Sequence, residues 1–179
     1  FGKALDAVQR VIKLQPDLPF GFMVRAGILT KSGDHQGGLE AYEEALKIEP
    51  DHVGSNMGIG NVLKTVGRFD ESVEAYKKCI KTQPLFAEAY WSLANLKTYQ
   101  FKASEIEQME HHVKNEMMLE EHKAFFHIAL ANAKEKEKKF DAAWQHFMGG
   151  NTMRRSGEIY DAVQTQVSHD ELINTFTED

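Results

Sequence analysis

The sequence predicts an all-α protein, built as a solenoid of antiparallel helix pairs wound into a right-handed superhelix. The first observation behind this prediction is that Pro16, Pro50 and Pro84 are spaced by 34 residues, twice in succession. Other columns repeat with the same period: small residues at Ala4, Gly38 and Ser72, bulky residues at Val8, Tyr42 and Tyr76, and small or apolar residues at Val11, Ala45 and Cys79. The second observation is that apolar residues recur at steps of three and four, without a competing strand pattern. A fixed period of this length is typical of helix–turn–helix arrays, which usually act as binding surfaces.

Composition limits the class of protein. The chain has 179 residues, of which 42% are hydrophobic and 27% are charged, so it can bury a core and stay in solution. No run approaches 18 uncharged apolar residues, so we expect no membrane partner. A net charge of −6 argues against a nucleic-acid partner, whose binding domain should be basic. The single cysteine, Cys79, gives no disulfide framework and suits a reducing compartment, so we expect a cytoplasmic protein.

Residues 1–16 have the pattern of the second helix of a truncated repeat. An apolar stripe at helical spacing is formed by Ala4, Leu5, Val8, Val11 and Ile12. Because the first helix of this repeat would precede residue 1, we expect a fragment that begins mid-repeat. Leu5, Val8 and Ile12 would then lack a covering helix, and the open face would favour self-association through the N-terminal helix.

Two full repeats follow, at residues 17–50 and 51–84. In the first, Asp17 is suited to cap the entering helix and Pro19 to occupy its first turn. Gly33 and Gly67 mark the turns between the paired helices. Each of these repeats is therefore expected to be one antiparallel helix pair.

The pattern loosens after residue 84. Residues 85–118 form a degenerate repeat, because Thr98 to Lys102 stands where a turn glycine is due, and Ser104 then starts the partner helix with capping-box spacing. Residues 119–157 are a repeat-like pair after three extra residues, and the charged run from Lys134 to Lys139 is expected to be a solvated helix end. Residues 158–179 are expected to form a C-terminal capping helix or linker. We expect about ten helices in all, most of about 12–16 residues.

The repeat columns resemble those of tetratricopeptide repeats over about residues 1–98. The matching positions are Leu29, Gly33, Gly38, Tyr42, Ala45 and Pro50, and again Gly60, Gly67, Tyr76 and Pro84. Arg25 departs from the pattern, because its position usually holds Leu. The resemblance implies a scaffold that binds a protein or peptide on its concave face.

Residues 85–179 resemble a narrower group, the bacterial sulfotransferases that carry tetratricopeptide repeats. The resemblance lies in the segment from Ala89 to Tyr99, in Phe101 and Glu105-Ile106, in the segment from Gly150 to Arg155, and in Tyr160-Asp161 and Phe176-Thr177. In that family this region joins the repeats to a C-terminal sulfotransferase domain, whose Pro-Arg-Ser-Gly-type loop holds the 5′-phosphosulfate of the donor nucleotide. The sequence up to Asp179 contains no such loop, so we expect that this chain is not an enzyme and does not bind that nucleotide.

Histidines and carboxylates give no site for a metal, a cofactor or catalysis. His111 and His112 are adjacent and would point about 100° apart on a helix, and His122 and His127 lack the i,i+4 spacing of a chelating pair. The pairs Glu43-Glu44, Glu120-Glu121 and Asp170-Glu171 fall on exposed faces of amphipathic helices. A catalytic carboxylate pair needs a pocket that shifts one pKa, and nothing in the sequence marks one.

A binding groove has better support. The first helix of each pair should line the concave face, where equivalent positions form two ladders. The first ladder is Met23, Met57, Trp91 and Ile128, and the second is Gly27, Asn61, Asn95 and Asn132. Apolar side chains beside regularly spaced amides suit an extended peptide. The alternative is that the asparagines only fill polar gaps between helices, and the sequence leaves both interpretations open.

One known type of groove is excluded. Tetratricopeptide domains that bind the acidic C-termini of chaperones use Lys and Arg at set positions, where this chain has Met23, Gly27, Glu88 and Ser92, and only Asn61 fits. The leading hypothesis is therefore an interaction scaffold from the N-terminal part of a bacterial sulfotransferase polypeptide. The alternatives are a free-standing adaptor without an attached enzyme and a self-association module.

Overall fold

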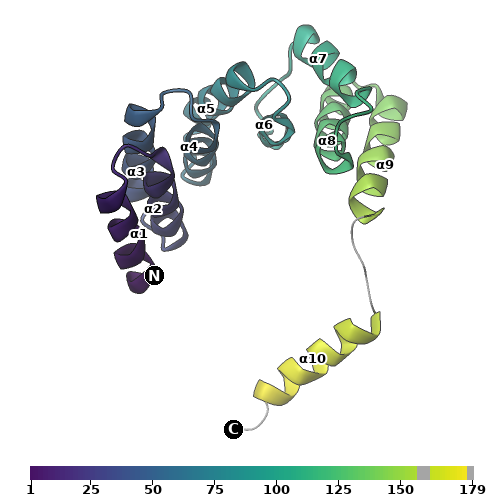
Figure 1. Cartoon of the computed structure of the whole chain (residues 1–179). Coiled ribbons are helices and arrows are strands. Elements are labelled where there is room, and N and C mark those ends of the chain that lie inside the picture. The colour runs from purple at the N-terminus through teal and green to yellow at the C-terminus, as the bar shows by residue number, and fades with distance from the viewer. Residues whose placement is uncertain (157–161, 177–179) are drawn as a thin grey trace.

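The computed structural model describes residues 1–156 and 162–176, which form ten helices and no strand. The helices are α1 (Gly2–Leu14), α2 (Pro19–Lys31), α3 (His35–Ile48), α4 (Val53–Thr65), α5 (Phe69–Thr82), α6 (Ala87–Ala94), α7 (Ala103–Val113), α8 (Glu120–Lys136), α9 (Phe140–Ser156) and α10 (Ala162–Phe176). Helices α1–α9 follow an arch, with α4, α6 and α8 along its inner side and α5 and α7 along its outer side (Figure 1). This arrangement confirms the prediction of an all-α solenoid.

Positive-φ glycines make the two predicted turns. Gly33 has φ of 91° and Gly67 has φ of 81°, a backbone conformation that residues with a side chain rarely adopt. Gly33 is followed by Asp34, whose carboxylate accepts a hydrogen bond from the Gly37 N–H at 2.9 Å and caps α3. The predicted cap of α2 is wrong, because Leu18 rather than Asp17 is its N-cap and no side chain bonds there.

The core consists of two clusters that meet on α4. The first joins α2, α3 and α4 through Ala26, Leu39, Ala41, Tyr42, Val62 and Leu63. The second runs from Met57 of α4 to Ala133 of α8 and includes Tyr76, Tyr90 and Phe126. Cys79 lies in this second cluster, and burial raises the pKa of its thiol to about 12. Helix α4 therefore contributes residues to both clusters, Met57 to the second and Val62 and Leu63 to the first.

Small residues in the repeat columns provide space for tyrosine rings. A Cβ at Gly60 would stand 2.4 Å from Cε1 of Tyr76, so only glycine fits beside that ring. Ser72 donates a hydrogen bond from Oγ to the Gly60 carbonyl at 2.8 Å, which joins α5 to α4 at the same point. The periodic small residues are therefore contact points within and between helix pairs.

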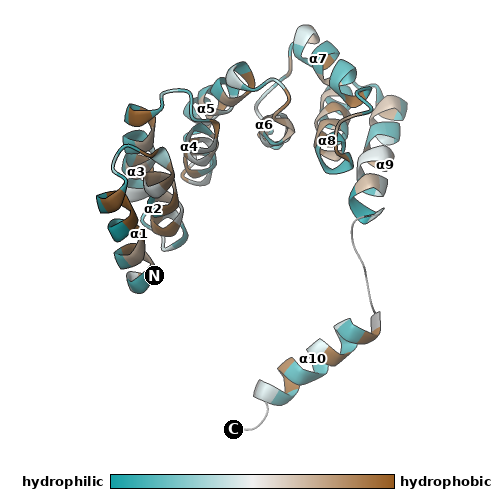
Figure 2. Ribbon diagram, viewed as in Figure 1, coloured by the Kyte–Doolittle hydropathy of each residue, from teal (hydrophilic) through white to brown (hydrophobic). Residues whose placement is uncertain are grey.

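Leu5, Val8 and Ile12 of α1 were expected to lack a covering helix, and this expectation is wrong for Val8 and Ile12. Val8 and Ile12 are only 5% and 8% exposed, because α2 packs on them, and Leu5 is half-buried. Gly21 of α2 permits this contact, since a Cβ there would stand 2.8 Å from Cγ1 of Ile12. The exposed large apolar residues at this end are instead Phe1, Val11, Leu14, Leu18 and Phe20. Figure 2 shows strongly apolar turns in α1 and α2.

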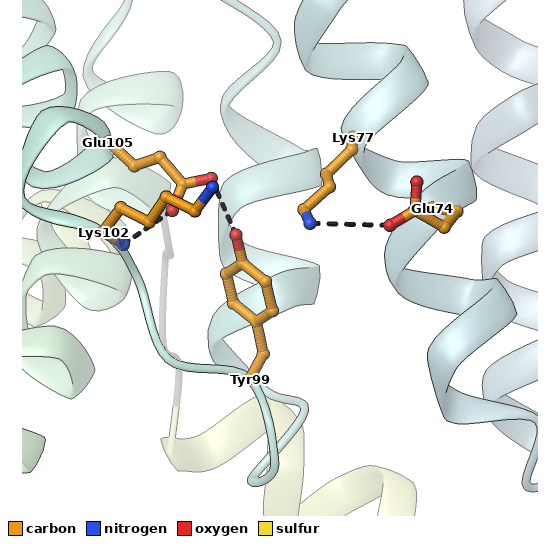
Figure 3. Close-up of polar contacts among 5 residues, drawn as sticks. All are labelled: Glu74, Lys77, Tyr99, Lys102 and Glu105. Atoms are coloured by element: carbon orange, nitrogen blue, oxygen red, sulfur yellow. Dashed lines mark hydrogen bonds and ion pairs between the residues drawn. The ribbon is translucent and has the colours of Figure 1, made fainter.

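The connection between α6 and α7 lacks the turn glycine of the other repeats and is held instead by contacts of Tyr99. The Tyr99 hydroxyl donates a hydrogen bond to Glu105 Oε1 at 2.7 Å, and the Lys102 N–H donates to Glu105 Oε2 at 2.7 Å, as Figure 3 shows. The ring of Tyr99 also lies 5.5 Å from Nζ of Lys77 on α5, and its carbonyl accepts from Lys136 of α8. This segment is therefore tied to α5, α7 and α8, although it has no regular structure.

The C-terminal part differs in length from the expected repeats. Helices α8 and α9 each have 17 residues, whereas α6 has only 8. Figure 1 shows α10 apart from the arch, and the rest of the expected capping segment, 158–161 and 177–179, lies outside the described residues. None of the helices in the described ranges is both long enough and apolar enough to cross a membrane.

Candidate functional site

The structure places the apolar ladder in two different environments. Met57 is 6% exposed and belongs to the core, so it is not accessible to a ligand in this structure. Met23, Trp91 and Ile128 are half-buried on α2, α6 and α8. Trp91 faces Phe125 of α8, with ring centroids 5.5 Å apart. Trp91 is therefore partly accessible on an inner helix, as the sequence predicted. Met57 occupies the equivalent position of its own repeat but is buried, and the repeat pattern alone does not distinguish the two cases.

The amide ladder is used mostly within its own repeats. Asn61 accepts a hydrogen bond from the Tyr76 hydroxyl at 2.7 Å, and Asn132 donates through Nδ2 to the Ile128 carbonyl at 2.9 Å. Asn95 is exposed and caps the C-terminus of α6. It lines a cavity of about 270 Å³ with Phe69, and Gly27, the fourth member of the ladder, faces open space. These contacts favour the structural alternative for Asn61 and Asn132, and the role of Asn95 in binding stays a prediction.

A larger cavity, of about 860 Å³, lies where α6 and α8 begin. The connections before these two helices form its rim. Its large apolar lining residues are Leu85, Phe86, Met117, Met118, Leu119 and Phe125. Phe125 belongs both to this lining and to the contact with Trp91, so the cavity adjoins one residue of the predicted groove. The structure thus joins one predicted residue to a pocket that the sequence analysis missed.

The missed part of the pocket is the connection between α7 and α8. Met117 and Leu119 are 92% and 67% exposed, although both are large and apolar. Asn115 shapes this connection, because its side-chain oxygen accepts a hydrogen bond from the Met117 N–H at 3.0 Å. The signal that could have revealed it is the run Met117-Met118-Leu119 between glutamates, in a segment where polar turn residues are the norm.

The charged groups of the cavity are acidic. Glu88 of α6 is half-buried, Glu121 of α8 is exposed, and both line the space. Among the described residues that line it, none is Lys or Arg, and His122 is the one side chain that can carry a positive charge. Chemically, this arrangement can enclose an apolar group and accept hydrogen bonds from a cation.

A pair of histidines lies elsewhere, between α8 and α9. Nδ1 of His127 is 3.0 Å from Nδ1 of His146, so one ring donates and the other accepts. Burial lowers the pKa of both imidazoles, and each lies near a cation, Lys123 for His127 and Lys134 for His146. Within the described ranges, no three His, Cys, Asp or Glu side chains gather as metal ligands would.

Comparison with known proteins supports the repeat assignment. The tetratricopeptide repeat family matches residues 22–52 and 53–84, so the chain contains two such repeats. A search of curated proteins gives no match. The fold is similar to that of MamA, residues 41 to the end, from Desulfovibrio magneticus RS-1, with a TM-score of 0.61 and 20% identity over 88% of each chain. It is also similar to YrrB, described as a TPR protein with an unusual peptide-binding site, with a TM-score of 0.59 and 17% identity over 86% of this chain and 78% of that one.

Proposed function

We propose that this tetratricopeptide-type solenoid is an interaction scaffold that binds an extended segment of a partner protein across α6 and α8. The observation that carries the proposal is the cavity of about 860 Å³, whose apolar rim is exposed. Exposed apolar residues around a pocket are typical of sites that bind a ligand or another protein, and they are uncommon on the rest of a protein surface. Solenoids of this kind commonly bind partners on their concave surface, and YrrB, which has a similar fold, is described as having an unusual peptide-binding site.

The chemistry of the lining suits a side chain of a partner polypeptide. Met117 and Met118 are flexible and polarizable, so they can adapt to apolar groups of different shape. Trp91 and Phe125 form a tilted aromatic pair beside the cavity, which offers an apolar surface along which the peptide can continue. The expected binding mode is one apolar side chain inserted near the start of α8, with the adjoining backbone lying along α6 and α8.

A selection of displayed peptides tests the proposal. Peptides selected on the chain should lose binding to the variant Met117→Glu with Leu119→Glu, since two carboxylates would then occupy the apolar rim. The matched control is Leu14→Glu with Met148→Glu, which adds the same charge at exposed apolar positions on α1 and α9. Peptides that bind both variants as well as they bind the original chain would locate the site elsewhere and refute the proposal.

A second proposal concerns the polypeptide that contains this scaffold. The resemblance of residues 85–179 to sulfotransferases with tetratricopeptide repeats favours a scaffold that presents substrates to an attached sulfotransferase domain in the cytoplasm. The alternative is an adaptor that functions without an enzyme. The reading frame beyond Asp179 separates the two, because a phosphosulfate-binding loop soon after this residue supports the first and a stop codon supports the second. For the chain itself we expect no nucleotide binding tighter than about 100 µM, about −5.5 kcal/mol, by calorimetric titration.

A further inference from the structure

We propose that the ligand of the α6–α8 cavity is a basic, apolar peptide segment, in which large apolar side chains alternate with Arg or Lys. This inference rests on the proposed function and specifies the chemistry of the partner. It follows from three properties of the cavity: its apolar interior, the sign of the charges on its wall, and the absence of Lys and Arg among the described residues that line it.

The two carboxylates of the cavity come from its two helices. Glu88 stands in the first turn of α6, and Glu121 in the first turn of α8. Within residues 1–156 and 162–176, neither carboxylate forms an ion pair. Lys123 follows Glu121 by two positions on α8, a spacing at which two helical side chains do not face each other, and its charge contributes to lowering the pKa of His127. The two carboxylates are therefore available to a cation that arrives with the ligand.

Helix stability alone does not account for this placement. Carboxylates are favoured at helix N-termini because they interact with the helix dipole, and this effect applies to Glu88 and Glu121. However, α8 has a second carboxylate in its first turn, Glu120, which accepts a hydrogen bond from Ser156 of α9 at 3.3 Å. Because Glu120 already supplies a negative charge at this terminus, Glu121 is not required there for the dipole. Its position on the wall of the apolar cavity points to a ligand that carries positive charge.

A peptide with an alternating pattern fits both properties. In an extended segment, neighbouring side chains point to opposite sides and have some freedom at their ends. A Leu side chain can enter between Met117 and Phe125, while the long side chain of an adjacent Arg turns back to Glu88 or Glu121. Charge-assisted hydrogen bonds from a guanidinium to a carboxylate are stronger than neutral ones, and they suit an open site of this kind. An acidic peptide would instead meet unfavourable charge at the same place.

Three fluorescein-labelled peptides of equal length and identical Gly-Ser flanks test the inference by fluorescence anisotropy. Their central motifs are Leu-Arg-Leu-Arg, Leu-Glu-Leu-Glu and Ser-Arg-Ser-Arg. We expect the first to bind at least about tenfold more tightly than either of the others, and its affinity to fall as salt is raised. The variant Glu88→Gln with Glu121→Gln should weaken this binding about tenfold, and Glu88→Lys with Glu121→Lys should reverse the preference toward Leu-Glu-Leu-Glu.

The control is Glu49→Gln with Glu107→Gln, which removes the same charge at exposed positions outside the cavity and should change nothing. Failure of Leu-Arg-Leu-Arg to bind, equal binding of the first two peptides, or equal binding of the two basic peptides each overturns the inference. In those cases the selection with Met117→Glu and Leu119→Glu still decides the proposed function separately. If selected peptides depend on Met117 and Leu119 but not on charge, the scaffold proposal stands and the basic ligand does not.

Discussion

Two tyrosines of neighbouring segments differ in what their hydroxyl groups contact. Tyr99 donates to the carboxylate of Glu105, a charge-assisted hydrogen bond, and burial together with this carboxylate raises the pKa of its phenol. Tyr90 is fully buried beside Phe126, and its hydroxyl has no hydrogen-bond partner among the described residues. The same chemical group therefore stabilises the fold in one place and carries an uncompensated desolvation cost in the other.

Removing each hydroxyl should have opposite consequences. We expect Tyr99→Phe to lower the free energy of unfolding by about 1–2 kcal/mol, because a hydrogen bond to a charged group is lost. Tyr90→Phe should leave the stability unchanged or raise it slightly, since no bond within the described structure is lost. Urea denaturation of both variants measures the difference. Equal destabilisation would show that the Tyr90 hydroxyl has a partner, such as a buried water molecule.

At the scale of helices, glycines decide how closely two helices approach. Gly60 of α4 lies against the Tyr76 ring of α5, which is fully buried and held by a hydrogen bond to Asn61. Gly27 of α2 has no atom within 4 Å of its would-be Cβ. Both are inside helices, where alanine is intrinsically favoured over glycine.

Alanine at these two glycines should therefore shift stability in opposite directions. We expect Gly60→Ala to cost about 1–3 kcal/mol, because the added methyl group overpacks the contact between α4 and α5. Gly27→Ala should instead stabilise by up to about 1 kcal/mol through helix propensity alone. Thermal unfolding followed by circular dichroism gives both values. Stabilisation in both variants would mean that Tyr76 can move aside.

The contact between α8 and α9 should be sensitive to acid. Because the pKa values of His127 and His146 are lowered in the folded state, the unfolded chain takes up protons first as the pH falls through the ordinary value of 6.5. The stability that the neutral pair contributes is present above this pH and is lost below it. Lys123 and Lys134 add to the effect, and Glu110 opposes it at His146.

Removing both imidazoles tests this expectation. The variant His127→Gln with His146→Gln should lose less stability between pH 7.5 and pH 5.5 than the original chain, as measured by urea denaturation at each pH. His122→Gln, which removes an exposed histidine away from the pair, is the matched control. An unchanged pH dependence in the double variant would assign acid sensitivity to other groups.

At the scale of the whole molecule, both ends of the arch carry exposed apolar side chains, in addition to those at the rim of the α6–α8 cavity. One end has Leu14, Leu18 and Phe20, and the other has Phe140 and Trp144 on α9. The interior helices are covered by neighbouring helices, whereas a helix at the end of the arch has a neighbouring helix on one side only. Open apolar surface of this kind favours association between molecules.

We therefore expect sedimentation velocity to show self-association as the concentration rises. Leu14→Glu with Phe20→Glu should reduce it, because both side chains are exposed and their replacement leaves the core intact. Val8→Glu would not be a suitable test, since Val8 is buried under α2 and a charge there would unfold the end of the arch. If Phe140→Glu with Trp144→Glu abolishes association instead, the contact lies at the α9 end. A monomer at all concentrations would refute self-association.

The sequence predicted the regular part of this molecule better than its irregular part. The period of 34 fixed the columns of Gly60, Ser72 and Tyr76, because the same contacts recur in each repeat. The prediction that Met57 lines the groove was wrong, since register places it on the inner helix but does not show that its neighbours bury it. The cavity at α6 and α8 depends on two connections that are distant in sequence, and no periodicity describes them. For the same reason, the role of Tyr99 in the segment after α6 emerged only from the structure.

The buried thiol of Cys79 can be used to measure local opening of the array. Cys79 is fully buried in the middle of the arch, and its high pKa leaves almost no thiolate at neutral pH. A thiol reagent therefore cannot modify it until α5 separates from its neighbours. The rate of modification would measure how often the middle of the array opens, at one defined position and without an engineered label. The same measurement with and without a bound peptide would show whether ligand binding at α6 and α8 slows the opening of the adjacent helix pair.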